Sequence, residues 1–116
     1  MDHQLTEAAD QDLVDILRET GRQFGRLQRQ RYAELIQRAI EMIADNPDRP
    51  GSRRRDDLAV GLRSFHAELG ARRRGSASHV LYYLLGPLDD GRDGVITARL
   101  LHERMEPLRH LTRDLP

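Results

Sequence analysis

Two consecutive helical patterns within the first 46 residues constrain the fold of this chain most strongly. In the first pattern, side chains suited to one helix face recur at steps of three and four residues: Ala9, Leu13, Ile16, Leu17, Thr20 and Phe24. The second pattern has a similar stripe: Leu27, Gln28, Tyr32, Leu35, Ile36, Ala39, Ile40 and Ile43. Gly21 and Gly25 mark the junction, and Pro47 ends the second pattern because proline lacks a backbone donor. So short a junction predicts an antiparallel helix hairpin over about residues 6–46.

The beginning of the first helix is marked by a capping residue and by acidic side chains. Thr6 can accept a hydrogen bond from the first free backbone N–H groups, which makes it a candidate N-cap. Glu7, Asp10 and Asp12 place negative charge in the first turns, where it complements the helix dipole. We therefore expect the helix to start directly after Thr6.

After residue 57 the pattern changes from helical to strand-like. Three short runs, 62–67, 79–85 and 95–101, contain the β-branched and aromatic residues of this half. The segments between them are rich in Gly, Asp, Arg and Ser, which favours hairpins and therefore antiparallel pairing. The predicted fold class is α+β: one two-layer domain over 1–116, with the helix hairpin on a three-stranded antiparallel sheet.

The remaining segments receive simpler predictions. Leu5 is a candidate for a short additional N-terminal strand, and the sheet should span about residues 60–102, followed by a tail over 103–116. The segment 46–57, which contains two prolines, a glycine and three consecutive arginines, is predicted to be an exposed connection.

Composition excludes several classes of function. The chain has no cysteine, so it can form neither a disulfide nor a thiolate metal site, and this absence suits the reducing cytoplasm. No apolar run approaches the roughly 20 residues that span a bilayer. Five scattered histidines lack the spacing of metal ligands, and nothing indicates an organic cofactor. We expect a cytoplasmic protein without cofactor, metal or membrane association.

Charge is distributed unevenly, although the net charge is zero. Residues 1–21 carry six acids against one Arg (−5), residues 22–74 carry thirteen Arg against seven acids (+6), and the remainder has five Arg against six acids (−1). A net charge of zero argues against a general nucleic-acid-binding protein, and we expect no direct sequence-specific binding of nucleic acid. The basic middle of the chain favours an acidic protein partner. All nineteen cations are Arg, which reflects either forked contacts to anions or a coding bias.

Several short segments occur in a defined order from Leu5 to about Leu111. The chain opens with Leu5-Thr6-Glu7-Ala8-Ala9, followed by Asp12-Leu13 and Ile16. The later segments are Ala44-Asp45-Asn46-Pro47, Asp56-Asp57-Leu58, Gly61-Leu62-Arg63-Ser64-Phe65, His79-Val80-Leu81-Tyr82-Tyr83, Val95-Ile96 and Arg99-Leu100-Leu101-His102-Glu103-Arg104-Met105-Glu106-Pro107. In this order they resemble the ParE branch of the RelE/ParE toxin superfamily, the plasmid stabilisation proteins.

The resemblance implies a fold and a function. The fold is a short strand, two antiparallel helices and a three-stranded antiparallel sheet. The function is that of a type II toxin that inhibits growth by binding DNA gyrase, without catalysis, and that a ParD-like antitoxin neutralises in a hetero-oligomer. The expected target-binding residues are Arg99, His102, Arg104 and Met105.

Antitoxin binding also has a physical rationale. A two-layer domain of this size leaves part of its helix hairpin or sheet edge uncovered, and such an apolar groove accommodates an amphipathic segment. The basic second helix would favour an acidic antitoxin tail. The expected antitoxin-binding residues are Leu13, Leu17, Tyr32, Leu35, Ile36, Arg63 and Phe65.

The chain departs from the family pattern at three places. Glu7 replaces a common proline, residues 68–78 form an insertion where relatives have a tight turn, and Leu84 stands where many members have Arg. A phosphate-binding role at that strand position is therefore absent. These departures keep open a third possibility, a non-toxic member that retains antitoxin binding.

An enzymatic alternative follows from the sister RelE branch, whose members cleave mRNA on the ribosome. Metal-independent RNA cleavage needs a base, an acid and cations for the phosphate. His102, Arg63, Arg99 and Tyr83 supply these types, with His66, His79 and Tyr82 as further candidates. If Arg63, Tyr83 and Arg99 point outward on neighbouring strands, they form one polar surface, although at least one of Tyr82 and Tyr83 must face the core.

Overall fold

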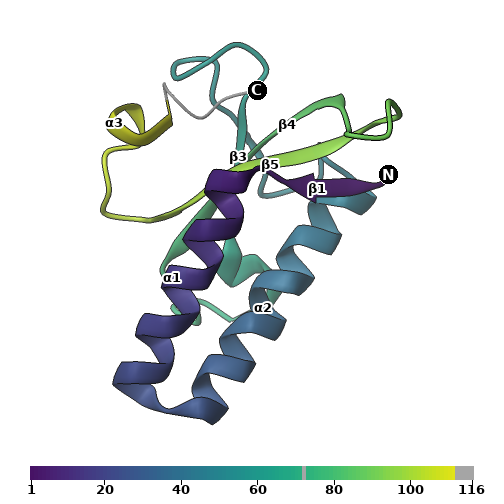
Figure 1. Ribbon diagram of the computed structural model, residues 1–116. Helices are drawn as coiled ribbons and strands as arrows, with labels where there is room; N and C mark the ends of the chain where they lie inside the picture. Colours follow the sequence, from purple (N-terminus) through teal and green to yellow (C-terminus); the bar gives the residue numbers. More distant parts are fainter. Residues whose placement is uncertain (72, 112–116) are drawn as a thin grey trace.

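In the computed structural model, which describes residues 1–71 and 73–111, a five-stranded sheet carries a long helix hairpin on one face (Figure 1). The strands are β1 (His3–Leu5), β2 (Arg53–Arg54), β3 (Arg63–His66), β4 (His79–Pro87) and β5 (Asp93–His102). The helices are α1 (Glu7–Phe24), α2 (Arg26–Asp45), the 3-10 helix η1 (Ala67–Gly70) and α3 (Pro107–Leu111). No helix in this described part is both long and apolar enough to cross a bilayer. The α+β fold class is confirmed.

The hairpin forms where its sequence pattern predicts it. Thr6 is the N-cap of α1, and its Oγ1 accepts a hydrogen bond from the Ala9 N–H at 3.1 Å. Gly25 alone separates α1 from α2, with φ of 90°, a conformation that side chains with a Cβ rarely adopt. The Gly25 N–H donates to the Gly21 carbonyl at 2.9 Å, which closes the last turn of α1. One glycine therefore reverses the chain and sets the helices antiparallel.

The predicted three strands form the centre of a larger sheet. Its order is β1-β5-β4-β3-β2, in which β1 pairs with β5 in parallel and the other neighbours are antiparallel. The candidate strand at Leu5 is confirmed as β1. The count of three was too low, because β2 consists of two exposed arginines that pair with β3 through the backbone alone and leave no apolar pattern.

The start of the insertion, residues 68–70, belongs to η1 and packs against the hairpin. η1 packs on α2 so closely that a Cβ on Gly70 would lie 2.9 Å from the Leu35 carbonyl oxygen. Arg38 Nη1 donates to the Gly70 carbonyl at 3.1 Å. Arg38 is an exposed residue of α2, and this hydrogen bond joins it to η1.

Each face of the sheet has its own hydrophobic core. The core under the hairpin contains Tyr32, Ile36, Ala39, Ile40, Ile43, Phe65, Ala67, Leu81, Tyr83, Val95 and Leu100. The core on the opposite face contains Leu62, Tyr82, Leu101 and Leu111. Tyr82 and Tyr83 point to opposite faces and are both buried, so each of them is a core residue. Because Leu111 of α3 fills the second core, the beginning of the predicted tail belongs to the folded domain.

Candidate functional site

The hairpin extends well past the edge of the sheet (Figure 1). Hollows lined by side chains of both helices lie along it. We call the one nearer the sheet the mid-hairpin hollow. It measures about 470 Å³ and is lined by Leu13, Leu17, Ala33, Glu34, Ile36, Gln37, Arg38 and Glu41. Apolar side chains of both helices thus form its floor, while charged and amide groups of α2 form its rim.

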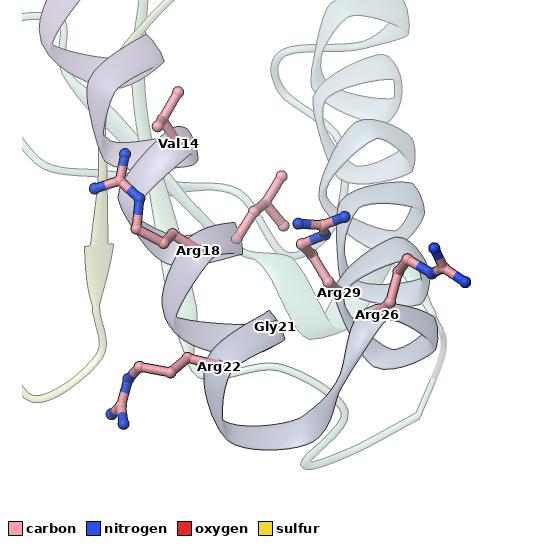
Figure 2. A pocket seen from close by; sticks show the side chains of 7 residues that line it. Val14, Arg18, Gly21, Arg22, Arg26 and Arg29 are labelled. Atoms are coloured by element: carbon pink, nitrogen blue, oxygen red, sulfur yellow. The ribbon is translucent and has the colours of Figure 1, made fainter.

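A second hollow lies at the free end of the hairpin, and we call it the tip hollow. It measures about 670 Å³ and is lined by Val14, Leu17, Arg18, Gly21, Arg22, Arg26 and Arg29. Figure 2 shows the arginines arranged around the short connection, two from the end of α1 and two from the start of α2. The two hollows share Leu17 and therefore adjoin along the hairpin.

Only two of the four tip arginines have acidic partners. Arg18 lies 3.6 Å from Asp15, and Arg22 forms a hydrogen-bonded pair with Glu19. The Arg22 hydrogen bond lowers the pKa of Glu19 and raises that of Arg22. Among the described residues, no carboxylate lies within ion-pair distance of the other two, Arg26 and Arg29, which leaves an excess of positive charge.

The residues expected to bind the antitoxin are divided by the fold. Leu13, Leu17 and Ile36 meet in the mid-hairpin hollow, and the half-buried Leu35 packs beside the core. Tyr32 and Phe65 lie within that core, 8% and 1% exposed.

Arg63 lies on the sheet, where its Nη2 pairs with Asp48 Oδ1 at 3.0 Å. The sequence reasoning missed the tip arginines as a group. Their spacing was the signal: Arg18 and Arg22 are four residues apart near the end of α1, and Arg26 and Arg29 are three apart at the start of α2, so each pair shares one face of its helix.

The expected target-binding residues cluster where β5 leads into α3, but they differ in their surroundings. Arg104 and Met105 are exposed in the turn after β5. Arg99 is only 16% exposed: its guanidinium pairs with Asp12 of α1, Nε to Oδ2 at 2.7 Å, and donates to the His110 carbonyl at 2.8 Å. Arg99 therefore joins α1, β5 and α3.

Histidines gather at the same end of the sheet. The Tyr32 hydroxyl accepts from the Ser78 N–H at 3.1 Å and lies 2.6 Å from His79 Nδ1. Because the hydroxyl oxygen accepts from Ser78, its own hydrogen is donated to His79 Nδ1, which requires a neutral His79 ring. Burial, with the neighbouring His102, lowers the pKa of His79 to about 4. The His79 ring meets the His102 ring edge-on, with centroids 5.4 Å apart.

A separate pair lies beside this cluster. His66 Nε2 is 2.7 Å from Glu103 Oε2, and this contact lowers the pKa of the Glu103 carboxyl. His102 Nδ1 accepts from the Arg104 N–H at 3.1 Å. The histidines thus have structural partners, while His102 keeps partial exposure at the surface.

The candidate nuclease residues are not gathered on one exposed surface. Tyr83 is fully buried, and its hydroxyl donates to the Pro47 carbonyl at 2.7 Å. Arg63 lies opposite Tyr83 in the register of β3 and β4, and Arg99 lies opposite Tyr82 in the register of β4 and β5. Because Tyr82 and Tyr83 point to opposite faces, the two arginines also project from opposite faces of the sheet. Within residues 1–71 and 73–111, no three acidic or histidine side chains are arranged to hold a metal ion.

Comparison with known proteins agrees with this architecture. Residues 4–107 match the family described as the ParE toxin of the type II toxin-antitoxin system, parDE. The chain is also 31% identical over 109 residues to Toxin ParE1 of Caulobacter vibrioides, an alignment that covers 94% of this chain and 96% of the relative. The family match contains both hairpin helices and the strands β2 to β5.

Proposed function

Because this chain belongs to the ParE toxin family of type II toxin–antitoxin systems, we propose that it inhibits DNA gyrase and that a ParD-like antitoxin neutralises it. An antitoxin partner follows from the family itself. The observation that carries the proposal is the family match over residues 4–107, which includes every element of the hairpin and the central sheet.

The geometry supports inhibition by binding rather than by catalysis. Of the candidate nuclease residues, Tyr83 is fully buried and Arg99 is held by Asp12 and by the His110 carbonyl. A phosphate group in solution would have to displace these partners before it reached either side chain. The exposed Arg104 and Met105, in contrast, are free to contact a protein target and remain our candidates for that role.

The hairpin groove is the proposed antitoxin site. Its adjoining hollows are open and carry charged rims. Apolar side chains of both helices line the mid-hairpin hollow, whereas those that line the tip hollow come from α1. An amphipathic helix lies in such a groove with its apolar face inward. The antitoxin would then cover the part of the hairpin that extends beyond the sheet.

Expression and supercoiling assays test the proposal. Expression of the chain alone should arrest growth, and co-expression of the neighbouring open reading frame should restore it. The purified chain should then inhibit supercoiling by gyrase, and the antitoxin should relieve that inhibition. A chain that arrests growth while gyrase remains fully active would overturn the proposed target. A chain that is harmless but binds its antitoxin would identify the non-toxic alternative.

Ribosome-dependent mRNA cleavage is the second candidate, favoured by one observation. His102 is partly exposed, and histidine is the side chain that most often serves as a general acid or base. Primer extension on translated messages separates the two functions. Codon-linked cleavage that disappears in His102→Ala supports the nuclease, whereas intact messages with an induced DNA-damage response support gyrase inhibition.

A further inference from the structure

The charges along the hairpin groove change sign between its two hollows, and this change specifies the partner more closely. We infer that the tip hollow binds the acidic part of an amphipathic antitoxin segment, an inference that rests on the proposed antitoxin site. The neutral or basic part of the same segment lies over the mid-hairpin hollow. The antitoxin segment is thus asymmetric in charge, and its orientation along the hairpin follows from that asymmetry.

The tip hollow has the charge that an acidic segment requires. Four arginines line it, and the two neighbouring acids, Asp15 and Glu19, leave a net charge of +2. Arg26 and Arg29 stand in the first turn of α2, which contains no acidic residue, and its N-cap Gly25 makes no side-chain hydrogen bond. The positive end of the helix dipole therefore adds to the arginine charge instead of being compensated.

The mid-hairpin hollow has the opposite character. Glu34 and Glu41 stand on its rim, and each accepts a hydrogen bond from an exposed glutamine one turn away. Arg38 is its one cation among the lining residues, and its guanidinium donates to the Gly70 carbonyl of η1. An acidic segment would meet two carboxylates here, whereas a basic or neutral one would meet complementary groups.

Close packing of the helices fixes one of the tip arginines in place. A Cβ built on Gly21 would lie 3.1 Å from Arg29 Cδ and 3.6 Å from its Cβ, so the aliphatic stem of Arg29 lies directly against α1. Its stem is therefore positioned before a partner binds, which reduces the ordering entropy that binding would otherwise cost. Figure 2 shows Arg29 on the side of α2 that faces α1, near Gly21.

Apolar side chains around the tip require that the acidic segment also be amphipathic. Val14 is 45% exposed, and Phe24 and Leu27, at the end of α1 and the start of α2, are 68% and 62% exposed. A purely acidic, fully solvated tail would leave these surfaces uncovered. Carboxylates alternating with apolar residues at helical spacing would cover both the apolar groups and the arginines.

Charge reversal tests the inference in the full chain with the antitoxin encoded beside it. Arg26→Glu/Arg29→Glu should weaken antitoxin binding about tenfold or more at low ionic strength, with most of the difference lost near 1 M salt because of screening. Arg31→Glu/Arg53→Glu is the matched control, since it changes the net charge equally at exposed positions outside both hollows. Far-ultraviolet circular dichroism verifies that both variants are folded.

Cross-linking tests the orientation, because the chain has no cysteine of its own. A photo-crosslinker is attached to Leu27→Cys beside the tip hollow or to Gln37→Cys in the mid-hairpin hollow. Mass spectrometry of the complex should place the first cross-link in a net-negative stretch of the antitoxin and the second in a neutral or basic stretch. The reverse assignment would overturn the inference.

The outcomes also separate this inference from the proposed function. Suppose that the antitoxin neutralises the toxin, but that Arg26→Glu/Arg29→Glu weakens their affinity no more than the control does. The proposed function would then stand, and the charge-specific orientation would be rejected. Absence of any complex with the encoded antitoxin would reject the antitoxin site itself.

Discussion

Asp12 and Arg99 form a two-pronged ion pair between α1 and β5. Arg99 Nε and Nη2 donate to the two carboxylate oxygens of Asp12 at 2.7 and 2.9 Å. Asp12 Oδ2 also accepts from the Leu100 N–H at 3.0 Å, so one carboxylate satisfies both side chain and backbone of β5. The side chains of Arg99 and Asp12 are only 16% and 14% exposed, and this pair fixes the hairpin to the sheet.

Removal of one partner of this pair should destabilise the fold considerably. Asp12→Ala removes the carboxylate partner of a largely buried guanidinium and the acceptor of the Leu100 N–H, and we expect a loss of about 2–4 kcal/mol in the free energy of unfolding. Urea denaturation measures it. Arg22→Ala, which breaks the exposed pair with Glu19, is the control and should change stability far less, because solvent screens this pair. Equal losses in both variants would contradict the structural role of Asp12.

Stability should fall as pH decreases from about 6.5 to about 4 because of His79. The folded-state pKa is depressed to about 4 from an ordinary 6.5, so the unfolded chain binds the proton first over this window. The contribution is fully present above pH 6.5 and is lost toward pH 4. At about 1.4 kcal/mol per pKa unit, this shift corresponds to about 3 kcal/mol in the free energy of unfolding. Because the ring is partly solvated, we expect a measured loss of roughly 2 kcal/mol.

Urea denaturation at several pH values checks this prediction, with His79→Gln as the comparison. The amide oxygen of glutamine can accept from the Tyr32 hydroxyl but does not titrate, so its stability profile should be flatter between pH 6.5 and 5. The Glu103 carboxyl, whose pKa is lowered, contributes stability that is lost only at more acid pH, as pH falls through its folded value. Parallel profiles for both proteins above pH 5 would show that His79 does not dominate this range.

Gly70→Ala should separate η1 from α2. The new Cβ would lie 2.9 Å from the Leu35 carbonyl oxygen and 3.2 Å from the Ala39 N, and backbone atoms cannot move aside as a flexible side chain can. We expect a loss of about 1–3 kcal/mol, measured by thermal or urea denaturation. Gly86→Ala meets only the tip of Ile96 at 3.4 Å and should be much milder. If both variants were equally stable, η1 would not be held against α2 in solution.

Val14→Glu should weaken antitoxin binding while leaving the fold intact. Val14 is 45% exposed and lines the tip hollow, so a carboxylate there removes apolar surface and neutralises part of the arginine charge. A decrease of roughly tenfold in affinity is expected, measured by titration calorimetry, with stability changed by less than about 0.5 kcal/mol. Val60→Glu is the matched control: this valine is 94% exposed and lines neither hollow. Identical affinities for the two variants would remove Val14 from the interface.

The sequence by itself determined the elements whose pattern is local. The periodic stripes, Thr6 and Gly25 specify a helix hairpin because capping, helical spacing and a left-handed glycine act within a few residues. The β-branched and aromatic runs likewise specify the three central strands. The ordered motifs between Leu5 and Leu111 indicate the toxin family without any knowledge of the tertiary structure.

Only the tertiary structure decided how distant residues meet. β2 exists because two arginines happen to lie beside β3, and the sequence carries no periodic signal for such a pairing. Arg99 looked like a surface cation, yet a register shift near Tyr82 and the approach of α1 place it against Asp12, 87 residues away. Strand register and helix packing depend on residues far apart in the sequence. The charged tip hollow and the partners of each candidate residue are therefore set by the tertiary structure.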